Sequence, residues 1–135
     1  MMDPREREAI FRESIDAWNA DDWKDRLREI WSPDGAIVAP EGWPESGEFQ
    51  GWPAMVEEWG RLKDSWAEER VEAIELEPIG DRLLGCVRWM MRGEASGAPL
   101  EADVWVLCDF EGRLLSKMAY FLNEAAARAA AESHE

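Results

Sequence analysis

Five polar side chains are candidates for chemistry in this sequence: Glu41, Arg88, Asp103, Lys117 and Tyr120. A carboxylate shielded from water at an apolar mouth is a stronger base and can abstract a proton near neutral pH. Glu41 begins a long loop beside Trp43 and is the candidate for this base. The developing oxyanion would be stabilised by Arg88, Tyr120 or Lys117, because a well-placed donor contributes ~3 kcal/mol. A desolvated lysine such as Lys117 could also act as a base or nucleophile.

Each of these side chains also has a structural interpretation. Glu41 could be a solvated loop residue, since the chain has 30 acidic residues. Arg88 could pair with an internal acid or cover the sheet with its aliphatic stem, and Lys117 could be held in a salt bridge. Asp103 interrupts an apolar strand and could form the polar rim of a dimer contact. Tyr120 could be an ordinary core or interface ring.

The charge and the rare residue types argue against several functional classes. A net charge of −15 repels nucleic acids and anionic membranes. The cysteines, Cys86 and Cys108, are too few for a disulfide framework and lack metal-site spacing. The only histidine is His134, which argues against a histidine zinc site and against histidine-dependent catalysis. We therefore expect no metal and no cofactor.

No segment of the sequence resembles a targeting or membrane-spanning segment. The N-terminus has no apolar stretch, and no run approaches the ~18 apolar residues of a membrane span. We therefore expect a cytoplasmic protein.

The chain is rich in aromatic residues, with nine tryptophans, four phenylalanines and one tyrosine in 135 residues. Such rings can fill the core or a subunit interface. Some of the tryptophans are also candidates for the walls of a pocket, namely Trp18, Trp43, Trp52 and Trp59. Two of these, Trp43 and Trp52, flank the long loop at 40–51.

The spacing of apolar residues predicts helices first and strands afterwards. Asp3 and Pro4 mark a helix start, and Asn123 can cap a final Ala-rich helix. The expected helices begin at 4, 23 and 53; a turn lies at 32–35, and strands lie at 36–39, 71–79, 82–92, 100–109 and 113–122. This order predicts an α+β fold with an antiparallel meander. A hairpin centred on Gly97 would place Cys86 opposite Cys108 and Trp89 opposite Trp105.

Several short segments, together with this order of elements, resemble a known family. The segments are Trp31-Ser32-Pro33-Asp34-Gly35, Glu41-Gly42-Trp43-Pro44 through Phe49-Gln50-Gly51, Gly80-Asp81, Ser96-Gly97, Glu111-Gly112-Arg113 and Glu124-Ala125-Ala126. Over nearly its whole length the chain resembles the SnoaL-like branch of the nuclear-transport-factor-2-like superfamily, which includes ketosteroid isomerases and polyketide cyclases.

The resemblance implies a single domain over 1–135, with 123–135 as a C-terminal helical tail. The implied fold is a cone-shaped α+β barrel, in which three N-terminal helices pack against a strongly curved, mostly antiparallel sheet. It also implies an apolar pocket at the wide end of the cone and a homodimer through the outer face of the sheet.

The family's catalytic positions are not intact here. The isomerase base falls at Pro40, next to Glu41, and the isomerase tyrosine falls near Ser14. The second isomerase acid falls near Val104, next to Asp103.

On the last strand, the aspartate of cyclases and epoxide hydrolases falls at Ala119, and the resemblance points Lys117, Ala119 and Phe121 into the pocket. The candidate ligand-binding residues are therefore Ser14, Trp18, Trp43, Trp52, Trp59, Val104, Ala119 and Phe121.

Three functions are compatible with these observations. The first is a cofactor-independent acid/base enzyme of the isomerase, cyclase or lyase type, acting on a small apolar carbonyl-containing substrate. The second is a non-catalytic protein that binds a small apolar ligand. The third is a dimeric assembly domain without chemistry, because one fold hosts many functions. Acid and base groups converging inside a dry pocket would favour the enzyme, and a wholly apolar lining would favour the binding protein.

Overall fold

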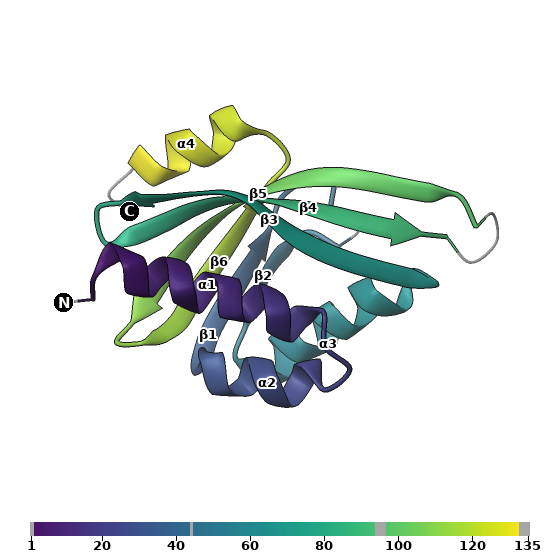
Figure 1. Ribbon diagram of the computed structural model, residues 1–135, viewed down its shortest axis with the longest axis horizontal. Helices are drawn as coiled ribbons and strands as arrows, with labels where there is room; N and C mark the ends of the chain where they lie inside the picture. Colours follow the sequence, from purple (N-terminus) through teal and green to yellow (C-terminus); the bar gives the residue numbers. More distant parts are fainter. Residues whose placement is uncertain (1, 44, 94–96, 133–135) are drawn as a thin grey trace.

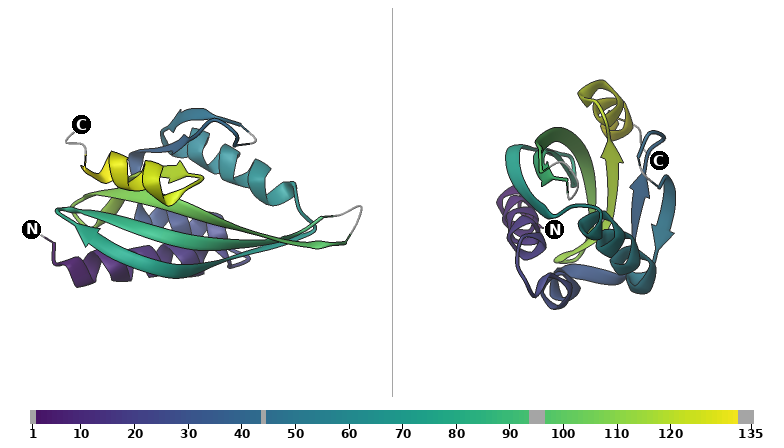
Figure 2. Two further views of the ribbon diagram at one scale, coloured as in Figure 1. Left: turned by 90° about the horizontal axis from the view of Figure 1, so that it is seen from above. Right: turned by 90° about the vertical axis from the view of Figure 1, so that its right-hand side faces the viewer.

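The computed structural model of the protein describes residues 2–43, 45–93 and 97–132, so that His134 lies outside the described residues. Its elements in chain order are α1 (Pro4–Trp18), α2 (Trp23–Ile30), β1 (Trp31–Ala39), β2 (Gly47–Gln50), α3 (Trp52–Asp64), β3 (Glu68–Ile79), β4 (Arg82–Arg92), β5 (Pro99–Glu111), β6 (Leu114–Phe121) and α4 (Glu124–Glu132). Helices α1, α2 and α3 lie on one side of the sheet, and α4 lies on the other (Figures 1 and 2). The expected α+β fold is confirmed.

The strands form one curved sheet in the order β2-β1-β6-β5-β4-β3. Strands β1 and β6 pair in parallel, and the other neighbouring pairs are antiparallel. The edge strands β2 and β3 do not pair with each other, so the sheet bends around the helices without closing into a barrel (Figure 2). This curvature creates the concave face on which α1 to α3 pack.

Helix α1 begins where the sequence predicts it. The Asp3 carboxylate accepts a hydrogen bond from the Arg5 backbone N–H at 2.7 Å, and Pro4 occupies the first turn. The helix lies close to the sheet because β4 has a glycine beneath it. A Cβ atom at Gly85 would lie 3.4 Å from Phe11 Cζ, which is buried in the core, and only 3.2 Å from Leu76 Cδ2.

Strand β1 starts earlier than predicted. A turn was expected at 32–35, but the strand already begins at Trp31. Its pairing with β6 shifts register between Trp31 and Ala36, and this irregularity accommodates the exposed Pro33. Proline is tolerated in strands at such bulges, where no ladder hydrogen bond is lost. The short strand β2, inside the segment predicted as a loop, was not predicted.

The register predicted for the β4–β5 hairpin is wrong by three residues. Cys86 faces Trp105, and Trp89 faces Ala102. The connection does not centre on Gly97, which lies near its end with a φ of 64° and donates its N–H to the Gly93 carbonyl at 3.0 Å. A turn position taken from glycine alone therefore misplaced the pairing.

The orientation predicted for the last strand is reversed. In the pairing of β5 with β6, Asp109 is opposite Lys117 while Phe110 is opposite Leu115, so β6 carries one extra residue. This bulge turns Met118 and Tyr120 toward the helices. Lys117, Ala119 and Phe121 therefore lie on the outer face, because an offset of one residue exchanges the two faces of a strand.

Apolar residues form two clusters, one on each side of the sheet. The larger cluster lies between the concave face and α1 to α3, and includes Phe11, Ile37 and Trp59. The smaller cluster packs α4 on the outer face through Leu84, Leu107, Ala127 and Ala131. Among the described residues, none of the helices has the length and apolar character needed to cross a membrane.

Candidate functional site

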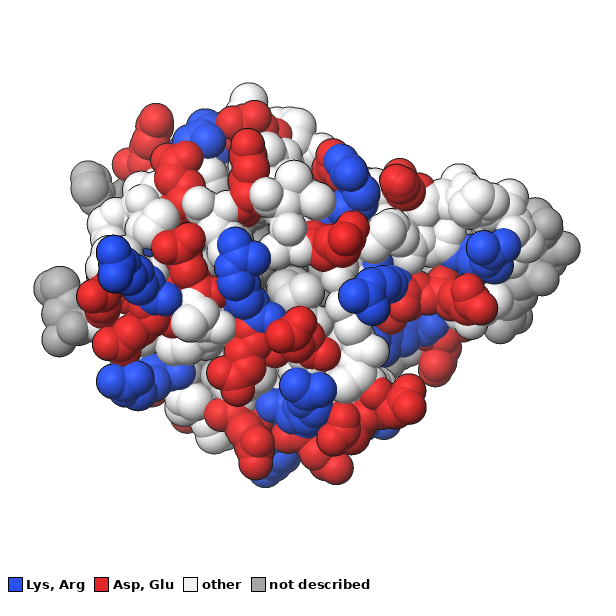
Figure 3. Space-filling view, viewed as in Figure 1, with Lys and Arg blue, Asp and Glu red and all other residues white. Residues whose placement is uncertain are grey.

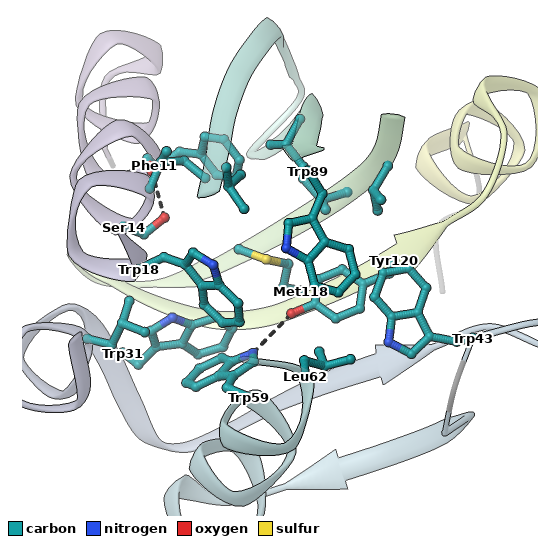
Figure 4. Close-up of a pocket in the computed structure, with 16 residues that line it drawn as sticks. Phe11, Ser14, Trp18, Trp31, Trp43, Trp59, Leu62, Trp89, Met118 and Tyr120 are labelled. Atoms are coloured by element: carbon teal, nitrogen blue, oxygen red, sulfur yellow. Dashed lines mark hydrogen bonds between the residues drawn. The ribbon is translucent and has the colours of Figure 1, made fainter. Parts of the chain in front are cut away.

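A cavity of about 90 Å³ lies between the concave face of the sheet and α1 to α3. Seven aromatic rings, from Phe11, Trp18, Trp31, Trp43, Trp59, Trp89 and Tyr120, form much of its wall (Figure 4). The remaining lining residues are Ser14, Ile15, Leu27, Leu62, Val71, Val87, Val104, Val106 and Met118. No charged side chain belongs to this lining in the described part of the chain, and the Ser14 and Tyr120 hydroxyls are its most polar groups.

The lining follows from the periodicity of the elements. On the strands, every second residue points inward, as for Val104 and Val106 on β5. On α1, residues three or four positions apart share one face, which places Ser14 and Trp18 on the cavity side. The Ser14 hydroxyl donates to the Phe11 carbonyl at 2.6 Å, so its oxygen can still accept a hydrogen bond from a ligand.

Tyr120 is a protonated hydrogen-bond donor inside the cavity. Its oxygen accepts the Trp59 Nε1–H at 3.1 Å (Figure 4). Burial raises the pKa of Tyr120, and the hydrogen bond from Trp59 only partly offsets this effect. The phenol is therefore neutral at physiological pH, and its proton is available to an acceptor in the cavity.

A buried ion pair holds two walls of the cavity. Glu69 Oε1 accepts hydrogen bonds from Trp18 Nε1 at 2.7 Å and from Trp89 Nε1 at 2.9 Å. Lys63 Nζ donates to Glu69 Oε2 at 2.8 Å and to the Trp18 carbonyl at 2.6 Å. The side chains of Lys63 and Glu69 are only 14% and 8% exposed. This network fixes the indole rings of α1 and β4 in place.

Replacing Lys63 with methionine is expected to lower the free energy of unfolding by about 3 kcal/mol, because Glu69 loses its compensating cation inside the protein. Chemical denaturation measures the loss. Lys24→Met is the matched control, because Lys24 is exposed and lies over the Trp23 ring at 5.5 Å. The control should change the free energy by less than about 0.5 kcal/mol, as is typical of surface substitutions. Equal losses in the two variants would contradict a structural role for the Lys63–Glu69 pair.

Trp43 belongs to the loop between β1 and β2 and forms one side of the cavity. Its ring stacks on Tyr120 at a centroid distance of 5.2 Å and on Trp89 at 6.0 Å. Its Nε1–H is buried and has no hydrogen-bond partner among the described residues. The same loop is bound to α3, because Glu45 forms an ion pair of 3.0 Å with Arg61.

Arg61 also holds the buried carboxylate of α3. The side chain of Glu58 is 2% exposed, and Arg61 lies 3.0 Å from it. Burial raises the pKa of Glu58, and the hydrogen bond from Arg61 opposes the shift. The folded protein therefore binds this proton more tightly than the unfolded chain.

The stabilising contribution of Glu58 should fall as the pH rises from its unfolded-state pKa through its raised folded-state pKa. Glu58→Gln removes this titration, so its free energy of unfolding relative to wild type should be higher at pH 7 than at pH 4. Urea denaturation at the two pH values measures the difference. Glu57→Gln is the control, because Glu57 also binds Arg61, at 2.7 Å, but is 70% exposed. A pH-independent difference for Glu58→Gln would contradict the argument.

A family model described as the SnoaL-like domain matches residues 11–118. This chain belongs to the SnoaL-like family. The match of the family model confirms the predicted relationship. No curated protein matches the chain.

Solved structures with the same fold are similar to this SnoaL-like protein at low sequence identity. A protein from Jannaschia sp. CCS1, named as a candidate SnoaL-like polyketide cyclase, is 15% identical, with a TM-score of 0.77 over 97% of this chain and 94% of that one. TerC, co-crystallised with polyporic acid, is 17% identical, with a TM-score of 0.76 over 95% and 99%. A protein of ketosteroid isomerase-like fold from Catenulispora acidiphila, in complex with trimethylamine, is 13% identical, with a TM-score of 0.73 over 89% of each chain.

Six of the predicted site residues of this SnoaL-like protein meet in the cavity wall, namely Ser14, Trp18, Trp43, Trp59, Val104 and Tyr120. Trp52 lies beside the cavity, where its ring contacts Trp59 at 6.0 Å and Arg28 lies over it at 5.5 Å. It supports the wall without lining it.

The other predicted catalytic side chains lie away from the cavity. Glu41 is exposed in the loop. Arg88 and Asp103 form an ion pair of 3.0 Å on the outer face of the sheet, where their side chains are 40% and 49% exposed. Lys117 is exposed on the outer side of β6.

Two predicted ligand-binding residues also lie on the outer face. Ala119 is opposite Leu107, and Phe121 is opposite Trp105. Leu107, Trp105 and Phe121 belong to the cluster under α4. Both therefore differ from the inward orientation that the family resemblance implied. Among the described residues, no group of three metal-ligating side chains could hold a metal ion.

Sequence reasoning missed several wall residues and the network behind them. Trp31 lay outside the strand predicted at 36–39, and Trp89 was placed by the wrong hairpin register. Met118 was missed because the bulge was unknown. Nothing in the sequence marks Lys63 and Glu69 as an ion pair, because their contact depends on how the chain turns between α3 and β3.

Proposed function

We propose that this SnoaL-like protein binds a small, largely apolar molecule in its aromatic cavity. The observation that carries the proposal is the lining, which contains seven aromatic rings and no carboxylate, lysine or arginine in the described part of the chain. Acid/base catalysis near neutral pH needs a group that exchanges its proton in that range within hydrogen-bonding reach of the substrate. Tyr120 is the titratable side chain of the described lining, and burial raises its pKa further above neutral pH. The lining therefore favours the binding protein over the enzyme.

The volume of the cavity restricts the part of the ligand that can be enclosed. An apolar cavity of ~150 Å³ holds benzene, so a cavity of about 90 Å³ suits a group of about four heavy atoms. Relatives of this fold have been solved with molecules as different as trimethylamine and polyporic acid. The fold itself therefore does not select the ligand, and selection depends on the lining of each protein.

The test is a titration with a small molecule, followed by intrinsic tryptophan fluorescence and by calorimetry. The probe is 3,3-dimethyl-1-butanol, whose tert-butyl group has about four heavy atoms. It should bind saturably, and the best small ligands reach about −1.5 kcal/mol per heavy atom, so four enclosed atoms allow a Kd no tighter than about 40 µM. Absence of saturable binding up to the solubility of the probe would contradict the proposal.

The acid/base enzyme is a second candidate because Tyr120 presents an available hydroxyl proton. In this candidate Tyr120 polarises a substrate carbonyl and Glu41 takes the proton after the loop has moved toward the cavity. The enzyme would then exchange α-protons of a small ketone with solvent. Incubation with cyclopentanone in D₂O, followed by NMR, tests it. Exchange above the rate with Tyr120→Phe supports the enzyme, and equal rates exclude this role for Tyr120.

The homodimer through the outer face of the sheet remains a proposal based on the family. Arg88, Asp103 and Trp105 lie on that face. Sedimentation equilibrium over a range of protein concentrations tests it. A monomer at all concentrations would contradict it, and the cavity proposal would not be affected.

A further inference from the structure

We propose that the group enclosed by the cavity is an alkylated ammonium cation, with a trimethylammonium headgroup as the best fit. This inference rests on the proposed ligand-binding function and adds the charge and chemical class of the ligand. The face of an aromatic ring carries the negative part of its quadrupole, so several rings around one void attract a cation. Figure 4 shows the rings approaching the void from opposite sides.

The hydrogen bonds of the wall leave the cavity with ring surface and few donors, among them the Tyr120 hydroxyl and the unpartnered Trp43 Nε1–H. Trp18 and Trp89 donate their N–H groups to Glu69, and Trp59 donates to Tyr120. These three indoles therefore cannot bind a ligand oxygen. Donation to a carboxylate also polarises the indole and increases the electron density of the ring. Both effects favour a cation over an oxygen-rich ligand.

A cation next to one wall ring is already neutralised. Lys63 Nζ lies 4.1 Å from the centroid of the Trp18 ring, a distance typical of a cation–π contact. Its charge is balanced by Glu69 at 2.8 Å, so the pair does not repel a second cation strongly. No lysine or arginine is part of the cavity lining within the described residues.

The whole protein also attracts cations. Its formal net charge is −15, and acidic side chains are spread across the face seen in Figure 3, with basic side chains between them. A negative surface raises the local concentration of cations and their association rate. This attraction acts before the ligand reaches the aromatic wall.

Alkylation matches the cation to a dry cavity. A primary ammonium has three N–H donors that need acceptors when buried, and among the described residues the side chains of the wall offer only the oxygens of Ser14 and Tyr120. A trimethylammonium group has no N–H donor and presents methyl groups to the rings. Its nitrogen and methyl carbons match the group of about four heavy atoms that the cavity accommodates.

Choline and 3,3-dimethyl-1-butanol form a matched pair of probes, because they differ in the replacement of the quaternary nitrogen by carbon. Calorimetric titration at low ionic strength should give choline a Kd at least about tenfold lower, since desolvated cation–π contacts are worth about 2 kcal/mol. Added salt should weaken the binding of choline and leave the alcohol unchanged. Equal affinities, or tighter binding of the alcohol, would overturn the inference while leaving the proposed function intact. If neither probe binds, both fail.

A pair of variants separates the ring surface from simple apolar packing. Trp31→Leu keeps an apolar side chain in the wall, so it should weaken choline binding by about tenfold and change the binding of the alcohol by less than threefold. Trp105→Leu, on the opposite face of the sheet, should change neither affinity. Retained binding of the alcohol shows that the variant is folded. A parallel loss of both ligands in Trp31→Leu would contradict cation recognition.

Discussion

Replacing Trp59 with alanine is expected to lower the free energy of unfolding by about 4 kcal/mol, as for large buried aromatic residues. Trp59 is 2% exposed and makes edge-to-face contacts with Trp31 at 5.3 Å and Trp18 at 6.3 Å. Its loss would enlarge the cavity and remove the N–H that Tyr120 accepts. Urea denaturation at neutral pH measures the change.

Trp59→Phe separates the ring from its N–H group. This variant keeps most of the packing and loses the hydrogen bond to Tyr120, so about 1–2 kcal/mol should be lost. If Trp59→Ala and Trp59→Phe lower the free energy of unfolding equally, packing by the Trp59 ring does not hold the wall together. A loss below about 1.5 kcal/mol in Trp59→Ala would mean that the ring cluster rearranges freely.

Replacing Val104 with phenylalanine is expected to abolish ligand binding while the protein remains folded. Val104 is 5% exposed and points into the cavity from β5. The larger ring would occupy the volume available to a ligand. Binding of the probes should weaken by more than about a hundredfold, because insertion into a filled site costs several kcal/mol. Calorimetric titration measures the loss, and circular dichroism checks the fold.

Val104→Leu provides a graded comparison, since it adds a single carbon to the same position. It should weaken binding by about an order of magnitude, in line with ~1 kcal/mol or more for modest overpacking. Unchanged binding in Val104→Phe, with a native circular dichroism spectrum, would place the ligand somewhere other than this cavity.

Most elements of the fold could be predicted from local signals. The Asp3-Pro4 start of α1 and the apolar stripe of this helix are read directly from residues near one another in the chain. The same holds for β4, which ends at Arg92 as expected. Ser14 and Trp18, two of the candidate ligand-binding residues, both lie in the cavity lining because they share one helix face.

The errors arose where long-range pairing decides the geometry. The β4–β5 register depended on a connection longer than a turn centred on Gly97, and the bulge in β6 reversed Lys117, Ala119 and Phe121. A single inserted residue exchanges the faces for all residues that follow it in the strand. The alternation of side chains in the sequence does not show where such an insertion lies.

The polar network of the wall was likewise inaccessible to sequence reasoning. Glu69 has the same local context as many solvated glutamates, and its role depends on the meeting of Trp18, Trp89 and Lys63 from three elements. Buried polar groups need partners, but the sequence does not say which side chain supplies them.

The most direct test of a ligand in the aromatic cavity is the response of the indole N–H signals in a ¹H–¹⁵N spectrum. Titration with 3,3-dimethyl-1-butanol should shift the signals of wall tryptophans such as Trp18, Trp59 and Trp89 saturably, with one common Kd. The signals of Trp23 and Trp105, which do not line the cavity, should stay in place. Saturable shifts confined to Trp105, or no shifts at all, would contradict the account.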